Sequence, residues 1–172
     1  MSAEHSDAAP ASAAGRDAFG PAADVTPLIS MRPRLGDILV GRGLVGEAQV
    51  SQALVESRST GELLGRILLR HQWLFEDELA RALAAQLGLP YVAIGATGVD
   101  REIARLLPYD VGMRAAAIPI GLHGGTVRVA FADPCDEQAE SEVLQHLARY
   151  EPVVAELSDI ESAWRTVGRT GA

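Results

Sequence analysis

The chain has 172 residues and a formal net charge of −8, and all 15 of its basic residues are arginines. This charge argues against a general nucleic-acid or anionic-membrane surface, because both need cationic patches. No apolar run approaches the roughly 20 residues that span a bilayer, so no direct membrane insertion is expected. A single cysteine, Cys135, cannot form an internal disulfide, which predicts a cytoplasmic location.

The first 29 residues are rich in Ala, Ser, Pro, Gly and Asp and show no hydrophobic periodicity. Such a segment buries too little apolar surface to offset the entropy of ordering, so residues 1–29 are predicted to be a disordered tail. The last four residues, 169–172, are also expected to be flexible. Between these ends we predict a helical subdomain over residues 30–89 and an α+β subdomain over residues 90–168.

The helical subdomain contains one pattern twice. Residues 34–57 read RLGDILVGRGLVGEAQVSQALVES, and residues 63–86 read LLGRILLRHQWLFEDELARALAAQ. A shift of 29 residues aligns Gly36 with Gly65, and a fixed period of this kind indicates a supersecondary unit used twice. Each copy holds two apolar-periodic runs with a break between them. We therefore predict two helix-turn-helix units that form a small four-helix bundle.

The remaining chain alternates strand and helix signals. Gly124 and Gly125 separate two strand candidates, which is typical of a hairpin. Asp100 and Asp136 stand where helix caps are expected, and Ser158 with Glu161 has the spacing of a capping box. The predicted strands are residues 91–94, 115–122, 126–132 and 151–157, and the predicted helices are residues 101–107, 136–150 and 158–167. The fold class is thus α+β, with a mixed sheet of about four strands covered by helices.

The doubled pattern resembles the MshEN domain, the N-terminal domain of type II secretion (GspE-type) and type IV pilus assembly ATPases. The repeats follow R-L-G-x-x-L-x-x-x-G-x6-L-x-x-x-L-x-x-Q, with a five-residue spacer. The stretches Leu87-Gly88-Leu89-Pro90-Tyr91-Val92 and Ala132-Asp133-Pro134 support the resemblance. It covers residues 34–167. It implies a regulatory or adaptor domain that binds cyclic di-GMP, with each unit holding one half of the dinucleotide.

The resemblance also implies the site residues. Arginine pairs with phosphate or stacks on guanine, glycine allows close approach, aliphatic side chains form walls, and glutamine bonds a base or backbone. The candidate ligand-binding residues are Arg34, Leu35, Gly36, Leu39, Gly43, Val50, Leu54, Leu64, Gly65, Leu68, Leu79, Leu83 and Gln86. A second interpretation stays open for most of them, because aliphatic residues at helical spacing usually form a core and the glycines permit close helix packing.

The chain departs from the family pattern at three positions. Ser57 stands where the family has Gln, Leu63 where Arg is common, and Gln72 where a glycine breaks the helix. Serine does not reach as far as glutamine, leucine cannot pair with phosphate, and a side chain at Gln72 is expected to disturb the turn. Two outcomes remain open: one polar anchor per half still binds the nucleotide, or binding is lost and the domain docks on a secretion, pilus or glycosyltransferase partner.

No other site is indicated. The histidines and Cys135 show no metal-ligand spacing, and no G-x4-G-K-[ST] motif is present, so the ATPase engine is missing from the sequence. No acid, base and nucleophile converge in the pattern, so we expect no enzyme activity and no cofactor. The expected partners are cyclic di-GMP and a secretion or pilus assembly ATPase or platform protein.

Overall fold

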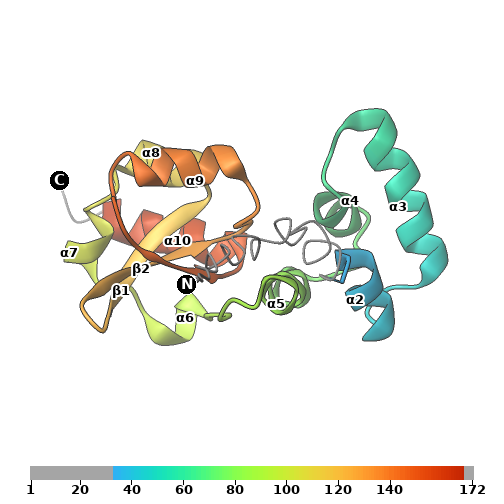
Figure 1. The fold of residues 1–172 in the computed structure, drawn as a ribbon, viewed down its shortest axis with the longest axis horizontal. Helices are drawn as coiled ribbons and strands as arrows, with labels where there is room; N and C mark the ends of the chain where they lie inside the picture. Colours follow the sequence, from blue (N-terminus) through green and yellow to red (C-terminus); the bar gives the residue numbers. More distant parts are fainter. Residues whose placement is uncertain (1–32, 169–172) are drawn as a thin grey trace, which may run out of the picture. The chain divides into compact units, whose positions relative to one another are not determined.

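The computed structural model of the protein describes residues 33–168; the predicted tails at residues 1–29 and 169–172 lie outside them. Helices α2 (Leu35–Gly41) and α3 (Glu47–Thr60) form the first predicted unit. Helices α4 (Leu64–Arg70) and α5 (Glu76–Leu87) form the second (Figure 1). The prediction of two helix-turn-helix units is therefore confirmed.

The two units pack across each other, because α3 contacts α4 and α2 contacts α5. Their shared core consists of aliphatic residues from all four helices, with Leu39, Ala53, Ile67, Leu68 and Ala82 fully buried. Helix α5 ends at Gly88, which adopts φ +67°. Glycine reaches this left-handed backbone without strain, as expected of a helix C-cap.

Short helices lead from the bundle to the sheet. They are α6 (Ile94–Thr97), α7 (Arg101–Ala104) and α8 (Tyr109–Arg114). The Asp100 carboxylate accepts hydrogen bonds from the backbone N–H groups of Glu102 and Ile103, so the predicted cap is confirmed. The predicted strand at residues 91–94 is wrong. Tyr91 makes only an isolated parallel bridge to Val154, and Ile94 begins a helix.

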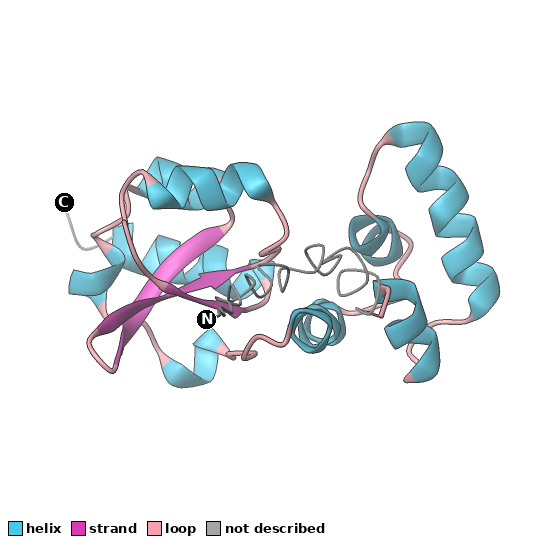
Figure 2. Ribbon diagram, viewed as in Figure 1, coloured by secondary structure: helices cyan, strands magenta, loops and turns pink. Residues whose placement is uncertain are grey.

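The sheet has three strands among the described residues: β1 (Ala117–His123), β2 (Thr126–Phe131) and β3 (Glu151–Val154). The pair β1–β2 is antiparallel and the pair β2–β3 is parallel, so the sheet is mixed (Figure 2). Gly124 and Gly125 form the hairpin tip, both at positive φ, as predicted. The expectation of about four strands is thus one too many, but the α+β class is confirmed.

Two helices complete the fold. Helix α9 (Glu137–Leu144) begins at the predicted cap Asp136 but ends before the predicted Tyr150. Helix α10 (Leu157–Gly168) begins one residue before Ser158, so the prediction that Ser158 caps it is wrong. Ser158 instead lies in the first turn, where its backbone N–H donates to a carboxylate oxygen of Glu76 in α5 at 3.0 Å.

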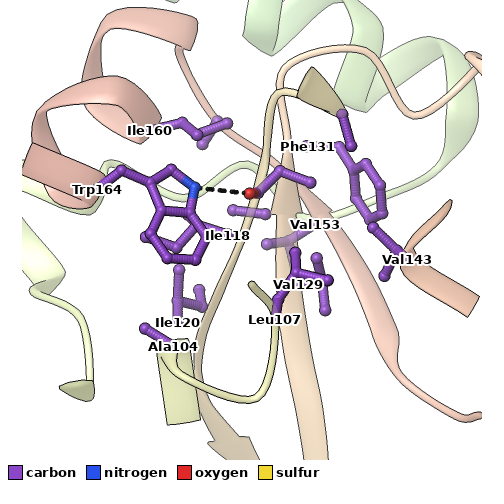
Figure 3. Close-up of a cluster of buried hydrophobic side chains, with 14 of the residues drawn as sticks. Ala104, Leu107, Ile118, Ile120, Val129, Phe131, Val143, Val153, Ile160 and Trp164 are labelled. Carbon is purple, nitrogen blue, oxygen red and sulfur yellow. Dashed lines mark hydrogen bonds between the residues drawn. The ribbon is translucent and has the colours of Figure 1, made fainter. Parts of the chain in front are cut away.

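The core of this second part lies between the sheet and its helices (Figure 3). Trp164 of α10 is 2% exposed, and its indole N–H donates to the Ala117 carbonyl at 2.9 Å. That bond satisfies the polar atom of the largest buried side chain. A smaller cluster joins Leu83 and neighbouring residues of α5 to Val154 of β3. The boundary between subdomains at residues 89 and 90 stays a prediction, since this cluster crosses it.

Candidate functional site

The two units start in the same way. Arg34 and Leu63 are the N-cap residues of α2 and α4, with φ, ψ of −69°, 148° and −67°, 142°. The breaks that follow are also alike. In each, the fourth residue after a core leucine reaches positive φ: Gly43 at +69° and Gln72 at +56°. The expectation that Gln72 disturbs the turn is wrong, because it takes the glycine's conformation. For a residue other than glycine this costs of order 1–2 kcal/mol.

The ends of the units are tied by equivalent hydrogen bonds. The Gln86 side-chain amide donates to the Pro33 carbonyl at 3.1 Å, and the Ser57 hydroxyl donates to the Glu62 carbonyl at 2.7 Å. Each donor closes one unit, and each acceptor is the residue before the N-cap of the facing helix. The shorter serine therefore keeps the backbone contact that the glutamine makes in the other unit. Its shorter reach toward a ligand stays a prediction.

The motif glycines lie where helices touch. A Cβ on Gly36 would lie 2.9 Å from a methyl carbon of Val50, and one on Gly65 would lie 2.9 Å from a methyl carbon of Leu79. Real Cβ atoms essentially never come so close. Both glycines are buried, so they first serve the packing of each unit. Their role in ligand contact stays a prediction.

Burial divides the remaining candidates. Most aliphatic ones belong to the core or its edge: Leu35, Leu39, Val50, Leu64, Leu68, Leu79 and Leu83. Arg34 and Gly43 are exposed, and Leu54 is 40% exposed. Gln86 is half-buried. Few candidate residues are therefore exposed enough to contact a ligand. Arg34 is the charged residue among them.

One cavity of about 290 Å³ adjoins the second unit. Its lining includes six of the candidates: Leu35, Leu64, Gly65, Leu79, Leu83 and Gln86. The other seven do not line it: Arg34, Gly36, Leu39, Gly43, Val50, Leu54 and Leu68. The structure thus brings residues of both units to one hollow, and it places Leu63 there as well.

The cavity also holds charged residues that the motif does not contain. Arg66 lies on α4 and Arg114 at the end of α8, and the acidic members are Glu76, Asp133, Asp136 and Glu156. Carboxylates accept hydrogen bonds, as guanine N–H groups require, and guanidinium groups bind phosphate. The position of Arg66 in the sequence, three residues after the motif position Leu63, is the feature that could have pointed to it. The cavity residues of the second subdomain come next to the repeat only when the chain folds, so the sequence alone does not point to them.

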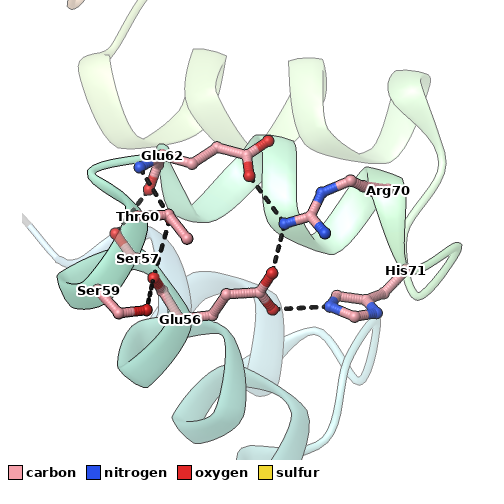
Figure 4. Close-up of polar contacts among 7 residues, drawn as sticks. All are labelled: Glu56, Ser57, Ser59, Thr60, Glu62, Arg70 and His71. Atoms are coloured by element: carbon pink, nitrogen blue, oxygen red, sulfur yellow. Dashed lines mark hydrogen bonds and ion pairs between the residues drawn. The ribbon is translucent and has the colours of Figure 1, made fainter.

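A polar network supports the start of the second unit (Figure 4). Glu56 of α3 forms an ion pair with Arg70 at the end of α4, and Arg70 also contacts Glu62 at 2.8 Å. His71 contacts the other oxygen of Glu56 at 2.8 Å and stacks on Trp73. The hydrogen bonds from His71 and then Arg70 hold the pKa of Glu56 below its ordinary value. The ion pair with Arg70 holds the side chain of Glu62, the residue directly before Leu63.

Within the described part of the chain, the remaining His, Cys, Asp and Glu side chains do not gather into a metal site. Among residues 33–168, no group of three or more His, Cys, Asp or Glu side chains is placed to hold a metal ion. Cys135 is exposed in the turn before α9. No helix within the same residues is long and apolar enough to cross a membrane.

Comparison with known proteins identifies the family. The family model of the MshEN domain matches residues 87–171. The type IV pilus assembly ATPase PilB of Thermus thermophilus is 39% identical over 119 residues, which are 68% of this chain and 13% of that ATPase. The chain spans about a quarter or less of the length of the curated relatives that it matches.

Solved structures agree with this assignment. A structure of MshE with cdg, the common abbreviation of cyclic di-GMP, is 38% identical to this chain and superposes with a TM-score of 0.69. The match covers 79% of this chain and 99% of the MshE chain. The N-terminal domain of XpsE, 22% identical, has a TM-score of 0.63 over 77% of this chain and 92% of that domain, which shows a shared fold. The chain therefore belongs to the MshEN domain family.

Proposed function

We propose that this chain is a non-catalytic, cytoplasmic regulatory domain that binds cyclic di-GMP through its double repeat. The observation that carries the proposal is the equivalence of the two units, from the N-cap backbone to the hydrogen bonds at Ser57 and Gln86. A ligand made of two identical halves is matched by a protein surface that presents the same backbone twice. The likeness to MshE, whose structure contains cdg, supports the same ligand.

Arg34 is the strongest polar anchor in this proposal. It is exposed, and no ion pair to it is found among the described residues, so its guanidinium is available to an anion. Guanidinium groups bind phosphate oxygens bidentately and also stack on aromatic rings. Both features fit a ligand that carries phosphates and guanines. The partly exposed leucines of the repeat and the cavity beside the second unit supply apolar surface for a guanine base.

Calorimetric titration of the purified chain tests the proposal. Cyclic di-GMP should bind, while GMP and GTP at the same concentrations should give no saturable heat, since neither offers two linked halves to the two units. The Arg34→Ala variant should bind cyclic di-GMP about ten- to a hundredfold more weakly, because a charge-assisted hydrogen bond contributes about 1.5–3 kcal/mol. A chain that binds none of the three nucleotides contradicts the proposal.

A second candidate function is docking on a protein partner of secretion or pilus type. Two large apolar side chains of the repeat support it: Phe75 is 73% exposed and Val55 is 65% exposed. Exposed aromatic residues are enriched in the anchors of protein interfaces. Failure of nucleotide binding, together with loss of partner capture in a Phe75→Ala variant, would favour this function.

A further inference from the structure

We infer that Arg66 supplies the cation of the second half-site, in place of the arginine that the repeat motif has at its first position. The inference rests on the proposed binding of cyclic di-GMP and names a residue outside the motif. In the first unit the motif arginine is present as Arg34, whereas the second unit has Leu63 at the equivalent N-cap.

The position of Arg66 suits this role. It lies in α4, three residues after Leu63, and residues three apart share one face of a helix. A long helical side chain leans toward the N-terminus and covers the turn that precedes its own Cα. By this rule we expect the guanidinium of Arg66 to lie over the turn that begins at Leu63, the position of the motif arginine.

The two units differ in the charges at these positions. The 29-residue shift aligns Arg34 with Leu63 and Asp37 with Arg66. The first unit thus carries a cation at its N-cap and an anion one turn later, and the second unit carries a leucine and then a cation. Each unit presents one arginine within its first turn, although the position differs.

Arg66 is also available to a ligand. It is exposed and lines the cavity of about 290 Å³ together with Leu63, Leu64 and Gly65. No ion pair to Arg66 is found within residues 33–168. The other arginine of the cavity, Arg114, is already engaged by Glu142 at 2.8 Å and by Asp110 at 3.9 Å. A phosphodiester at the second half-site would therefore meet Arg66.

Titration of four forms of the full chain with cyclic di-GMP tests this assignment. They are the natural chain, Arg66→Gln, the control Arg149→Gln and the double variant Arg66→Gln with Leu63→Arg. Arg149 is exposed and does not line the cavity, so its substitution removes the same charge elsewhere. We expect Arg66→Gln to raise the dissociation constant about ten- to a hundredfold and Arg149→Gln to change it less than about twofold.

The double variant shows whether Arg66 takes the place of the motif arginine or affects binding only through its charge. If Arg66 replaces the motif arginine, then Leu63→Arg restores at least most of the binding that Arg66→Gln loses. Unchanged binding by Arg66→Gln, or a loss that Leu63→Arg does not restore, overturns the inference while leaving the proposed function intact. Absence of binding by the natural chain overturns both. Thermal unfolding of each variant verifies folding, which an exposed Arg-to-Gln change should leave within about 0.5 kcal/mol.

Discussion

Gly36 and Gly65 occupy equivalent positions, but the side chains that face them differ in stiffness. A methyl group on Gly36 would meet Val50, whose branched Cβ restricts it to few rotamers. A methyl group on Gly65 would meet both methyl carbons of Leu79, at 2.9 and 3.1 Å, which end a longer side chain with one more rotatable bond. The same substitution should therefore have unequal effects in the two units.

We predict that Gly36→Ala lowers the free energy of unfolding by about 1–2 kcal/mol, since overpacking costs about 1–3 kcal/mol and the gain in helix propensity offsets part of it. Gly65→Ala should cost less than about 1 kcal/mol. Gly41→Ala is the control: it lies in the same helix as Gly36 with nothing within 4 Å of an added Cβ, so it should stabilise slightly. Urea denaturation measures all three. Equal effects of Gly36→Ala and Gly65→Ala would contradict the packing account.

At residue scale, the sequence located the motif but not the function of each member. The glycines were visible from the repeat, yet their contacts with Val50 and Leu79 depend on how the helices cross. Ser57 is shorter than the glutamine of the motif, and the sequence alone does not show which backbone group it contacts. In the fold, its hydroxyl lies 2.7 Å from the Glu62 carbonyl oxygen. Contacts of this kind follow from tertiary structure alone.

At the scale of elements, strong local signals predicted the repeat helices and the hairpin correctly. Helix α8 lies between the predicted helix at residues 101–107 and the predicted strand at residues 115–122, where no element is predicted, and Gly112 lowers the helix propensity of this segment. In the fold, Gly112 of this helix packs against Trp164 so closely that a Cβ would lie 2.2 Å from the indole. Helix α9 also differs from the prediction, because it ends at Leu144 instead of residue 150. The chain turns after Leu144, and this leaves Leu144 46% exposed while Leu147 is buried.

A substitution can test directly which side chains of β2 face the core. Phe131 is 2% exposed and packs in the core beside Val143 (Figure 3), so Phe131→Ala should reduce the free energy of unfolding by about 3–5 kcal/mol. Leu122→Ala in β1 is the matched control, because Leu122 is 59% exposed and its truncation should cost less than about 0.5 kcal/mol. Chemical denaturation compares them. A cost below about 1 kcal/mol for Phe131→Ala would mean that the strand faces the other way.

At the scale of the whole molecule, Tyr91 ties the repeat to the sheet. Its hydroxyl donates to Glu156, after β3, at 2.7 Å, and the Arg81 guanidinium of α5 lies 4.3 Å from the ring centre. Burial, followed by the hydrogen bond to Glu156, raises the pKa of Tyr91 to about 12. The folded state thus favours the neutral phenol. This contribution to stability is complete below about pH 10, the ordinary tyrosine pKa, and is lost as the pH rises through about 12.

Tyr91→Phe keeps the ring and removes the hydroxyl. At pH 8 we expect it to lower the free energy of unfolding by about 1.5–3 kcal/mol, the contribution of a hydrogen bond to a charged group. The difference between the natural chain and the variant should shrink between pH 10 and pH 12. Tyr150, whose pKa burial also raises to about 12, is present in both proteins and cancels in the comparison. A difference that stays constant with pH would show that the phenol does not ionise differently on unfolding.

We propose that the two equivalent units together hold one cyclic dinucleotide. The most direct measurement is the stoichiometry of cyclic di-GMP binding to the natural chain, determined by calorimetry at a protein concentration well above the dissociation constant. We predict one cyclic di-GMP per chain in a single transition, because in the proposed site each unit contacts one half of the same ligand. No binding, or two ligands bound per chain at independent sites, would contradict it.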